Sequence, residues 1–300
     1  MFYLGGPVWG AKKWLGTLFP PGTATRDFLS TYSRRLNTVE GNGTFYAMPS
    51  LETMRRWREE TPADFRFCCK FPRTISHDLK LHSAAQETAT WLSCLRALGE
   101  RAGPAFLQLP PDFSPAQLPL LRGYLRALPR DLRFAVEVRH PGWFQPGPEA
   151  ALGTLLRELG MARVLFDVRP LRGASPRELE DADAQEALRR KPDVPVRFLR
   201  TAPFTLIRYI SHPDPAANAR FLDEWVDALS AWLSEGTEVF FFLHHPGDQH
   251  VPTLCRELHQ RLSARVPLPP LPPFPGPAQD LDRGGERPAK AAARSQLSLF

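Results

Sequence analysis

The residues Val239-Phe240-Phe241-Phe242-Leu243 form the longest strongly apolar run in the chain. An uninterrupted apolar run is typical of a strand buried on both faces, because a half-buried strand alternates apolar and polar side chains. Strands of this kind occur mainly in parallel sheets that are covered by helices. The run is far too short to span a bilayer, so it does not indicate a membrane segment.

Strand and helix patterns alternate outward from this run over nearly the whole chain. The first strand is expected near Phe2–Leu4, and the last helix is expected over Pro252–Ala264. Between these limits the patterns give eight strand–helix units over about 265 residues. We therefore predict a single (β/α)8 barrel of the TIM type, with a doubly wound parallel sheet as the alternative. One of the helices is expected over Pro176–Arg190, with Ser175 as its N-cap.

The composition changes after residue 266. Eight of the last 34 residues are proline, and Lys290–Arg294 is a basic, Ala-rich stretch. A segment of this composition buries too little apolar surface to offset the entropy lost on ordering it. We therefore predict a folded domain over residues 1–266 and a flexible, disordered Pro/Ala-rich tail over residues 267–300.

The tail ends in a short, largely apolar motif, Gln296-Leu297-Ser298-Leu299-Phe300. This motif resembles the pentapeptide by which bacterial replication and repair proteins dock onto the ring-shaped DNA sliding clamp. The resemblance implies that the clamp is a partner and that four side chains bind it: Gln296, Leu297, Leu299 and Phe300. The alternative is an apolar end that folds back onto the domain.

Charge and cysteine content restrict the location and the partners. The formal net charge is +6 and the isoelectric point is about 9.4, which is compatible with a phosphate-rich partner such as a nucleic acid. The basic residues are spread along the chain, so no single segment predicts a nucleic-acid interface. None of the four cysteines forms a CxxC pair, and no signal peptide is visible. We therefore expect reduced thiols and a cytoplasmic location.

Polar residues stand where most of the predicted strands end. In a (β/α)8 barrel these carboxyl ends meet at one mouth, where the active sites of this fold lie. Seven of the eight strand ends carry a polar or ionisable side chain: Glu40, Lys70, Gln108, Glu137, Asp167, Arg208 and His244. Further polar residues follow in the loops: Asn42, Tyr46, His77, Arg139 and His140. Their convergence predicts a site at the mouth.

Residue type suggests a role for each of these side chains. Glu40, Glu137, Lys70 and Asp167 are the candidate catalytic residues, with a carboxylate as the base and Lys70 or a histidine as the acid. The candidate ligand-binding residues are Asn42, Tyr46, His77, Gln108, Arg139, His140, Arg208 and His244. Taken singly, several also have a structural explanation, since Asn42 could cap a turn and His140 could hold a loop.

The mixture of charges bears on cofactors. Carboxylates with His244 could hold a single divalent metal ion. Lys70, Arg139 and Arg208 would repel a cluster of metal ions, and they suit an anionic ligand such as a phosphate better. The chain has neither a Walker loop nor a GxGxxG motif, so no nucleotide cofactor is indicated.

Five motifs in order resemble the YecE-like family, a bacterial domain of unknown function 72. They are Asn37–Tyr46 (NTVEGNGTFY), Asp64–Pro72 (DFRFCCKFP), Leu107–Pro111 (LQLPP), Val136–Pro141 (VEVRHP) and Phe166–Pro170 (FDVRP). The resemblance covers about residues 1–265 and implies a TIM-type barrel distantly similar to endonuclease IV-like and xylose isomerase-like barrels. It implies no reaction, and the metal-ligand set of the endonuclease IV-like enzymes is not reproduced.

Three functional hypotheses follow from these observations. The first is a hydrolase or lyase that acts on a phosphate-bearing ligand, such as damaged or flapped DNA, and that the tail recruits to the sliding clamp. The second is a non-catalytic ligand-binding or adaptor protein. The third is an isomerase or lyase acting on a sugar or sugar phosphate, for which the tail is irrelevant.

Overall fold

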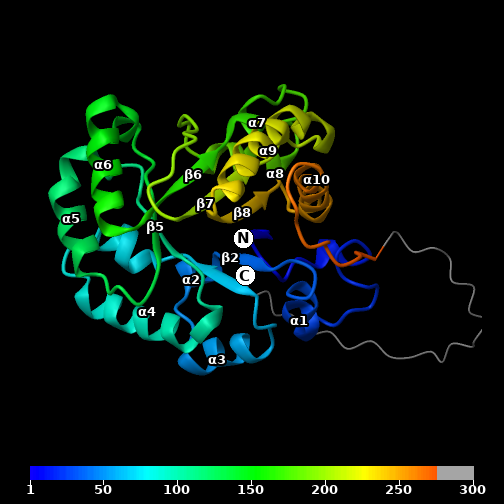
Figure 1. Cartoon of the computed structure of the whole chain (residues 1–300), viewed down its shortest axis with the longest axis horizontal. Helices are drawn as coiled ribbons and strands as arrows, with labels where there is room; N and C mark the ends of the chain where they lie inside the picture. Colours follow the sequence, from blue (N-terminus) through cyan, green and yellow to red (C-terminus); the bar gives the residue numbers. More distant parts are fainter. Residues whose placement is uncertain (276–300) are drawn as a thin grey trace, which may run out of the picture.

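The computed structural model describes residues 1–275 of the chain. Its strands are β1 (Phe2–Gly5), β2 (Thr38–Gly41), β3 (Arg66–Cys69), β4 (Ala105–Gln108), β5 (Phe134–Glu137), β6 (Ala162–Asp167), β7 (Phe204–Ile210) and β8 (Glu238–His244). Its α-helices are α1 (Phe28–Tyr32), α2 (Gly43–Tyr46), α3 (Leu51–Glu59), α4 (Ala85–Ala97), α5 (Leu118–Ala127), α6 (Pro146–Leu159), α7 (Arg169–Arg172), α8 (Ala182–Arg190), α9 (Ala219–Ser234) and α10 (Val251–Ser263). Figure 1 shows the helices arranged around the outside of the strands.

The strands form a parallel six-stranded sheet of order β1-β8-β7-β6-β5-β4 and a parallel β2-β3 pair. Backbone hydrogen bonds connect the pair to both edges of the larger sheet. The amide of Glu40 donates to the carbonyl of Gly6 at 3.0 Å, and the amide of Phe71 donates to the carbonyl of Phe106 at 3.0 Å. Glycine is required at position 5, because a Cβ there would lie 2.1 Å from the carbonyl oxygen of Thr38.

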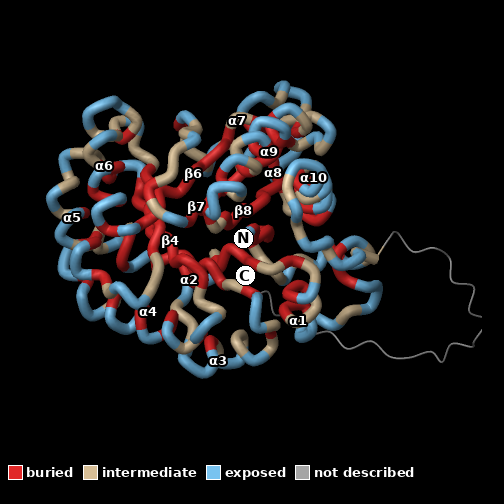
Figure 2. The backbone as a smooth tube through the Cα atoms, viewed as in Figure 1, coloured by how far each residue is buried: buried red, intermediate tan, exposed pale blue. Residues whose placement is uncertain are grey.

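The apolar run of β8 is buried on both faces, as the sequence predicts. Phe240 and Phe242 belong to an inner cluster with residues of β1, β3, β4, β5, β6 and β7. Val239, Phe241 and Leu243 belong to the larger cluster between the strands and the helices. Figure 2 shows the strands as the buried centre, with the exposed surface on the helices and loops.

The helix predicted over Pro176–Arg190 begins later than the sequence suggests, so that prediction is wrong at its N-terminal end. Helix α8 begins at Ala182, and its N-cap is Asp181, whose side chain accepts a hydrogen bond from the amide of Ala184. Ser175 instead stabilises a separate turn, in which its hydroxyl and amide both donate to Glu178. Two serviceable N-caps lie six residues apart, and the pattern alone does not choose between them.

The first part of the predicted tail contacts the domain. Residues 267–275 contain no helix or strand, but Leu268, Leu271 and Phe274 pack against the core. Large apolar residues at every third position lie on one face of a polyproline II helix, which has three residues per turn. His259 on α10 adds a hydrogen bond from Nε2 to the carbonyl of Pro269 at 2.9 Å. The clamp-binding motif, Gln296–Phe300, lies outside the described residues.

Candidate functional site

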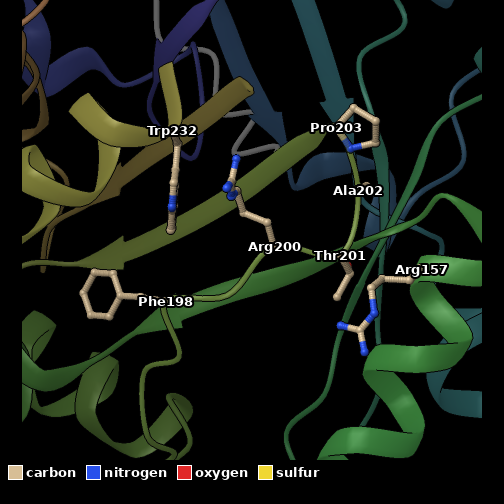
Figure 3. Close-up of a pocket in the computed structure, with 7 residues that line it drawn as sticks. All are labelled: Arg157, Phe198, Arg200, Thr201, Ala202, Pro203 and Trp232. Atoms are coloured by element: carbon tan, nitrogen blue, oxygen red, sulfur yellow. The ribbon is translucent and has the colours of Figure 1, made fainter. Parts of the chain in front are cut away.

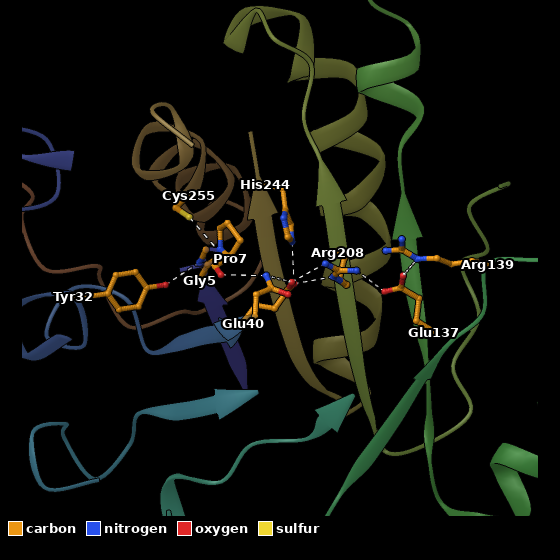
Figure 4. A network of polar contacts seen from close by, with 11 residues as sticks. Gly5, Pro7, Tyr32, Glu40, Glu137, Arg139, Arg208, His244 and Cys255 are labelled. Carbon is orange, nitrogen blue, oxygen red and sulfur yellow. Dashed lines mark hydrogen bonds and ion pairs between the residues drawn. The ribbon is translucent and has the colours of Figure 1, made fainter. Parts of the chain in front are cut away.

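The alternation of side chains along the strands brings charged residues together just beyond the inner apolar cluster. Ala135, Leu206 and Phe242 belong to that cluster. Two residues further along each strand stand Glu137, Arg208 and His244, which therefore point to the same face. Glu40 joins them from β2, as Figure 4 shows. All four are at most 7% exposed.

Arg208 is the centre of this group. Its Nε and Nη2 donate to the two carboxylate oxygens of Glu40 at 2.9 and 2.7 Å, and its Nη1 donates to Glu137 Oε2 at 2.6 Å. Burial lowers the pKa of Arg208, but Glu137 and Glu40 outweigh that effect and raise it. The guanidinium therefore stays charged and fixes the positions of both carboxylates.

Glu40 accepts hydrogen bonds from two further side chains. Asn42 Nδ2 donates to Glu40 Oε1 at 2.6 Å, and His244 Nε2 lies 2.9 Å from Glu40 Oε2. Burial raises the pKa of Glu40, but Arg208 and His244 together hold it well below its usual value, so the carboxylate is ionised. An ionised carboxylate only accepts, so the hydrogen lies on His244 Nε2. Burial lowers the pKa of His244 to about 4 despite Glu40, which leaves the ring neutral at pH 7.

Glu137 is held on its other side by Arg139. The Nε of Arg139 donates to Glu137 Oε1 at 2.7 Å. Burial raises the pKa of Glu137, but the charges of Arg208 and Arg139 overcome this and bring it to about 2. Glu137 is therefore a fixed negative charge and a weak base at neutral pH. Among the described residues, no side chain accepts from the two Nη groups of Arg139.

Two lysine amines lie close enough to these arginines for their pKa values to respond. Burial, followed by the charges of Arg208 and Arg139, lowers the pKa of Lys70 to about 6 and that of Lys191 to about 7. The Nζ of Lys70 lies 3.7 Å from the ring centroid of Phe45. Within residues 1–275, no carboxylate forms an ion pair with either amine. The pKa values of these two amines are therefore near neutral pH, whereas those of Glu40 and Glu137 are lowered.

Lys191 is a residue that sequence reasoning missed. It follows α8 and stands far from any strand end, so no motif or spacing singles it out. Asp248, in the loop after β8, also responds to this environment. Burial raises its pKa to about 6, although Lys191 and Lys13 lower it. The loop after α8 brings Lys191 near the charged residues at the strand ends, and this proximity depends on the tertiary fold.

The remaining predicted site residues are placed differently. Tyr46 is 72% exposed, and its ring centroid lies 5.1 Å from that of Phe45. His77 is half-buried, with its ring centroid 4.9 Å from that of Phe45, the ring that the amine of Lys70 contacts. Burial and then Lys70 lower the pKa of His77 to about 4. Gln108 is buried at the end of β4. His140 accepts a hydrogen bond from the amide of Gly142 through Nδ1 at 3.0 Å and so holds its loop.

Asp167 does not join the charged group. Its carboxylate accepts two hydrogen bonds from the guanidinium of Arg169, at 2.9 and 2.8 Å, one from the amide of Arg169, at 3.1 Å, and one from Trp225 Nε1 on α9, at 2.9 Å. The inward position at the end of β6 is taken by Phe166, whose ring lies beneath Arg208 and Arg139. The reason is the period of two along a strand, which turns Asp167 toward the helices.

The residues proposed as metal ligands are not gathered. Within residues 1–275, no three His, Cys, Asp or Glu side chains are grouped so that they could hold a metal ion. Glu40 and His244 are adjacent, but Asp167 lies on the other face of its strand and Glu137 is bound by two arginines. The four cysteines are buried free thiols.

A shallow depression of about 510 Å³ lies away from this group. Figure 3 shows Phe198, Arg200 and Trp232 at its edge, with Arg157 opposite them. It borders Thr201–Pro203, the segment that enters β7, and so lies toward the amino ends of the strands. The charged residues stand at the carboxyl ends, so the depression is not part of their site.

The fold and these residues define a class: an α/β protein with parallel strands and a charged layer at their carboxyl ends. The members of this charged layer are Glu40, Lys70, Glu137, Arg139, Lys191, Arg208 and His244. The chain belongs to the family described as "Protein of unknown function DUF72", which matches residues 3–279. This finding confirms the family resemblance. In the described part of the chain, no helix has both the length and the apolar character needed to cross a membrane.

Relatives agree with this assignment over nearly the full length. The UPF0759 protein YecE of Escherichia coli (strain K12) is 39% identical over 268 residues, which is 89% of this chain and 94% of that protein. A DUF72 family protein of Thermotoga maritima MSB8 has a similar structure, with a TM-score of 0.65 at 19% identity, over 88% of this chain and 99% of that one. A DUF72 family protein of Enterococcus faecalis V583 gives a TM-score of 0.64 at 20% identity, over 91% and 98%.

Proposed function

We propose that this chain is a cytoplasmic enzyme of the hydrolase or lyase class that binds a phosphate-bearing ligand at the carboxyl ends of its strands. The eight strands would form one (β/α)8 barrel. The hydrogen bonds from Glu40 to Gly6 and from Phe71 to Phe106 support closure, because they join β2 to β1 and β3 to β4. The charged layer would then line the mouth, where enzymes of this fold carry their sites.

The observation that carries the proposal is the imbalance of partners in the charged layer. The carboxylates of Glu40 and Glu137 are both already bound by arginines, whereas Lys70, Lys191 and the Nη groups of Arg139 form no ion pair with a carboxylate among the described residues. A phosphate would supply that partner to Arg139 and Lys191 and would favour the protonated form of the Lys191 amine. Arg139 and Lys191 are the proposed anion-binding groups.

The roles within the site differ from those expected from residue type alone. Arg208 and Glu40 serve as positioning residues, since their hydrogen bonds are made to each other and to neighbouring side chains of the site. Lys70 is the better general base, because its pKa of about 6 leaves a free amine at pH 7, whereas Glu137 is already ionised with a pKa of about 2. His77 and Tyr46 would contact the ligand from the rim.

The tail motif Gln296–Phe300 supports recruitment to the bacterial sliding clamp and, with the basic net charge, a DNA substrate. Tethering by a short motif would raise the concentration of the enzyme at DNA without a large affinity of its own. The test is binding of the full-length chain to a bacterial clamp, compared with Leu299→Ala/Phe300→Ala and with Lys290→Ala as the control. Binding lost only in the first variant supports recruitment, and equal binding by all three chains refutes it.

A further inference from the structure

Lys70 differs from an ordinary buried lysine in its surroundings. It stands directly after β3, on the face shared with Cys68 of the inner apolar cluster, and it is 8% exposed. Its Nζ lies 3.7 Å from the ring centroid of Phe45, and within residues 1–275 no carboxylate pairs with it. A buried lysine usually has such a partner, because an unpaired buried charge is expensive.

The charged groups that act on Lys70 come from four neighbouring elements. Arg208 on β7 and Arg139 after β5 disfavour its charge, whereas Glu137 on β5 and Glu40 on β2 favour it. Burial and the two arginines prevail, which brings the pKa to about 6. At pH 7 the fraction of free amine is then on the order of 10³-fold larger than for an ordinary lysine. Desolvation beside other cations is a recognised way to make lysine nucleophilic.

We infer that Lys70 is a catalytic nucleophile that forms an imine with an aldehyde or ketone carrying a phosphate group. This inference rests on the proposed function, because Arg139 and Lys191 would hold the phosphate while Lys70 attacks the carbonyl. The ligand chemistry has two sources, a free sugar phosphate in its open-chain form and the abasic sugar of a damaged DNA strand.

The reaction step is balanced without any further reactant. The lone pair of Nζ adds to the carbonyl carbon, and a proton passes from the nitrogen to the oxygen to give a carbinolamine. The second amine proton leaves with that oxygen as water, and a carbon–nitrogen double bond forms. The imine then takes up a proton from solvent. The cationic product occupies the place of the lysine ammonium, facing the fixed charges of Glu137 and Glu40.

The test is reductive trapping with the full-length protein. The chain is incubated at pH 7 with dihydroxyacetone phosphate in one arm and with a single-stranded oligonucleotide containing an abasic site in the other. Sodium borohydride then converts any imine to a stable secondary amine, and peptide mapping by mass spectrometry locates it. Mapping of the wild-type chain needs no variant, so a folding defect cannot confuse the result.

We expect an adduct at Lys70 in at least one arm, about tenfold or more above the exposed Lys80, and the arm that gives it identifies the source of the carbonyl. Lys70→Arg should abolish it, whereas Lys80→Arg should not. Absence of an adduct in both arms, or equal labelling of Lys70 and Lys80, overturns the inference. Binding of inorganic phosphate is measured separately. If phosphate binds but no adduct forms, the imine inference fails and the proposed phosphate site stands; if neither occurs, both fail.

Discussion

Arg208 on β7 binds both carboxylate oxygens of Glu40 on β2, at 2.9 and 2.7 Å, although 168 residues separate them in the sequence. A two-point contact of this kind fixes the orientation as well as the distance of the two groups. Arg208 also binds Glu137 at 2.6 Å, so it connects three strands. The positions of both carboxylates therefore depend on this one side chain.

Replacing Arg208 by methionine should destabilise the fold strongly. The variant leaves Glu40 and Glu137 buried with fewer cationic partners, and removing one member of a buried ion pair costs about 3–5 kcal/mol. Chemical denaturation measures the change in the free energy of unfolding. Arg96→Met is the control, because Arg96 makes a similar two-point contact with Asp131 at the exposed surface. Equal effects of the two substitutions would refute a central role for Arg208.

Glu137 should make the fold sensitive to acid. Its folded pKa of about 2 lies below the value of about 4.3 for an unfolded glutamate, so its contribution is complete above pH 4.3 and is lost as the pH falls toward 2. Glu137→Gln should reduce stability at pH 7 and flatten the loss between about pH 4 and pH 2. Unfolding free energies measured across this range test the prediction, and an unchanged slope in the variant would contradict it.

Lys70 should lower stability at neutral pH. The pKa of Lys70 is about 6 in the folded protein, whereas that of a lysine in the unfolded chain is about 10.4. Between these two pH values the unfolded state binds more protons, so the free energy of unfolding rises with pH. Lys70→Met should therefore unfold at higher urea concentration at pH 7, and its stability should rise less toward pH 9.5. A less stable variant with the wild-type slope would show that the amine is charged in the folded protein.

Asp167 should prove structural. Asp167→Asn weakens the two hydrogen bonds from the guanidinium of Arg169 and the one from Trp225, so the melting temperature should fall. Phosphate binding should be unchanged, because Phe166 and not Asp167 faces the charged layer. Calorimetric titration of the purified variant with phosphate is the measurement. A loss of phosphate binding in a folded Asp167→Asn variant would indicate that Asp167 takes part in the site.

The sequence predicts most of the arrangement because the relevant signals are local. The apolar run of β8 predicts burial on both faces, and the polar strand ends predict where Glu40, Glu137, Arg208 and His244 gather. Asp167 shows the limit, since a shift of one residue reverses the direction of a strand side chain. The position of Lys191 cannot be predicted from strand or helix patterns, because its proximity to the charged layer depends on how the loop after α8 folds.

The pKa values could not be anticipated from residue types either. A glutamate at a strand end looks like a base and a lysine looks like a cation. Here the two arginines fix Glu137 as an ion and, with burial, leave Lys70 largely uncharged at pH 7. The assignment of proton-transfer roles therefore follows from packing and not from composition.

The central claim is that the charged layer binds phosphate and that the bound anion favours protonation of Lys191. The direct test is calorimetric titration of the full-length chain with inorganic phosphate at pH 8, repeated in two buffers of different ionisation enthalpy. We predict binding with proton uptake, seen as buffer-dependent heats, and a loss of at least about tenfold in affinity for Lys191→Met but not for Lys80→Met. Absence of binding would contradict the claim. So would equal binding heats in the two buffers, or equal affinities of Lys191→Met and Lys80→Met for phosphate.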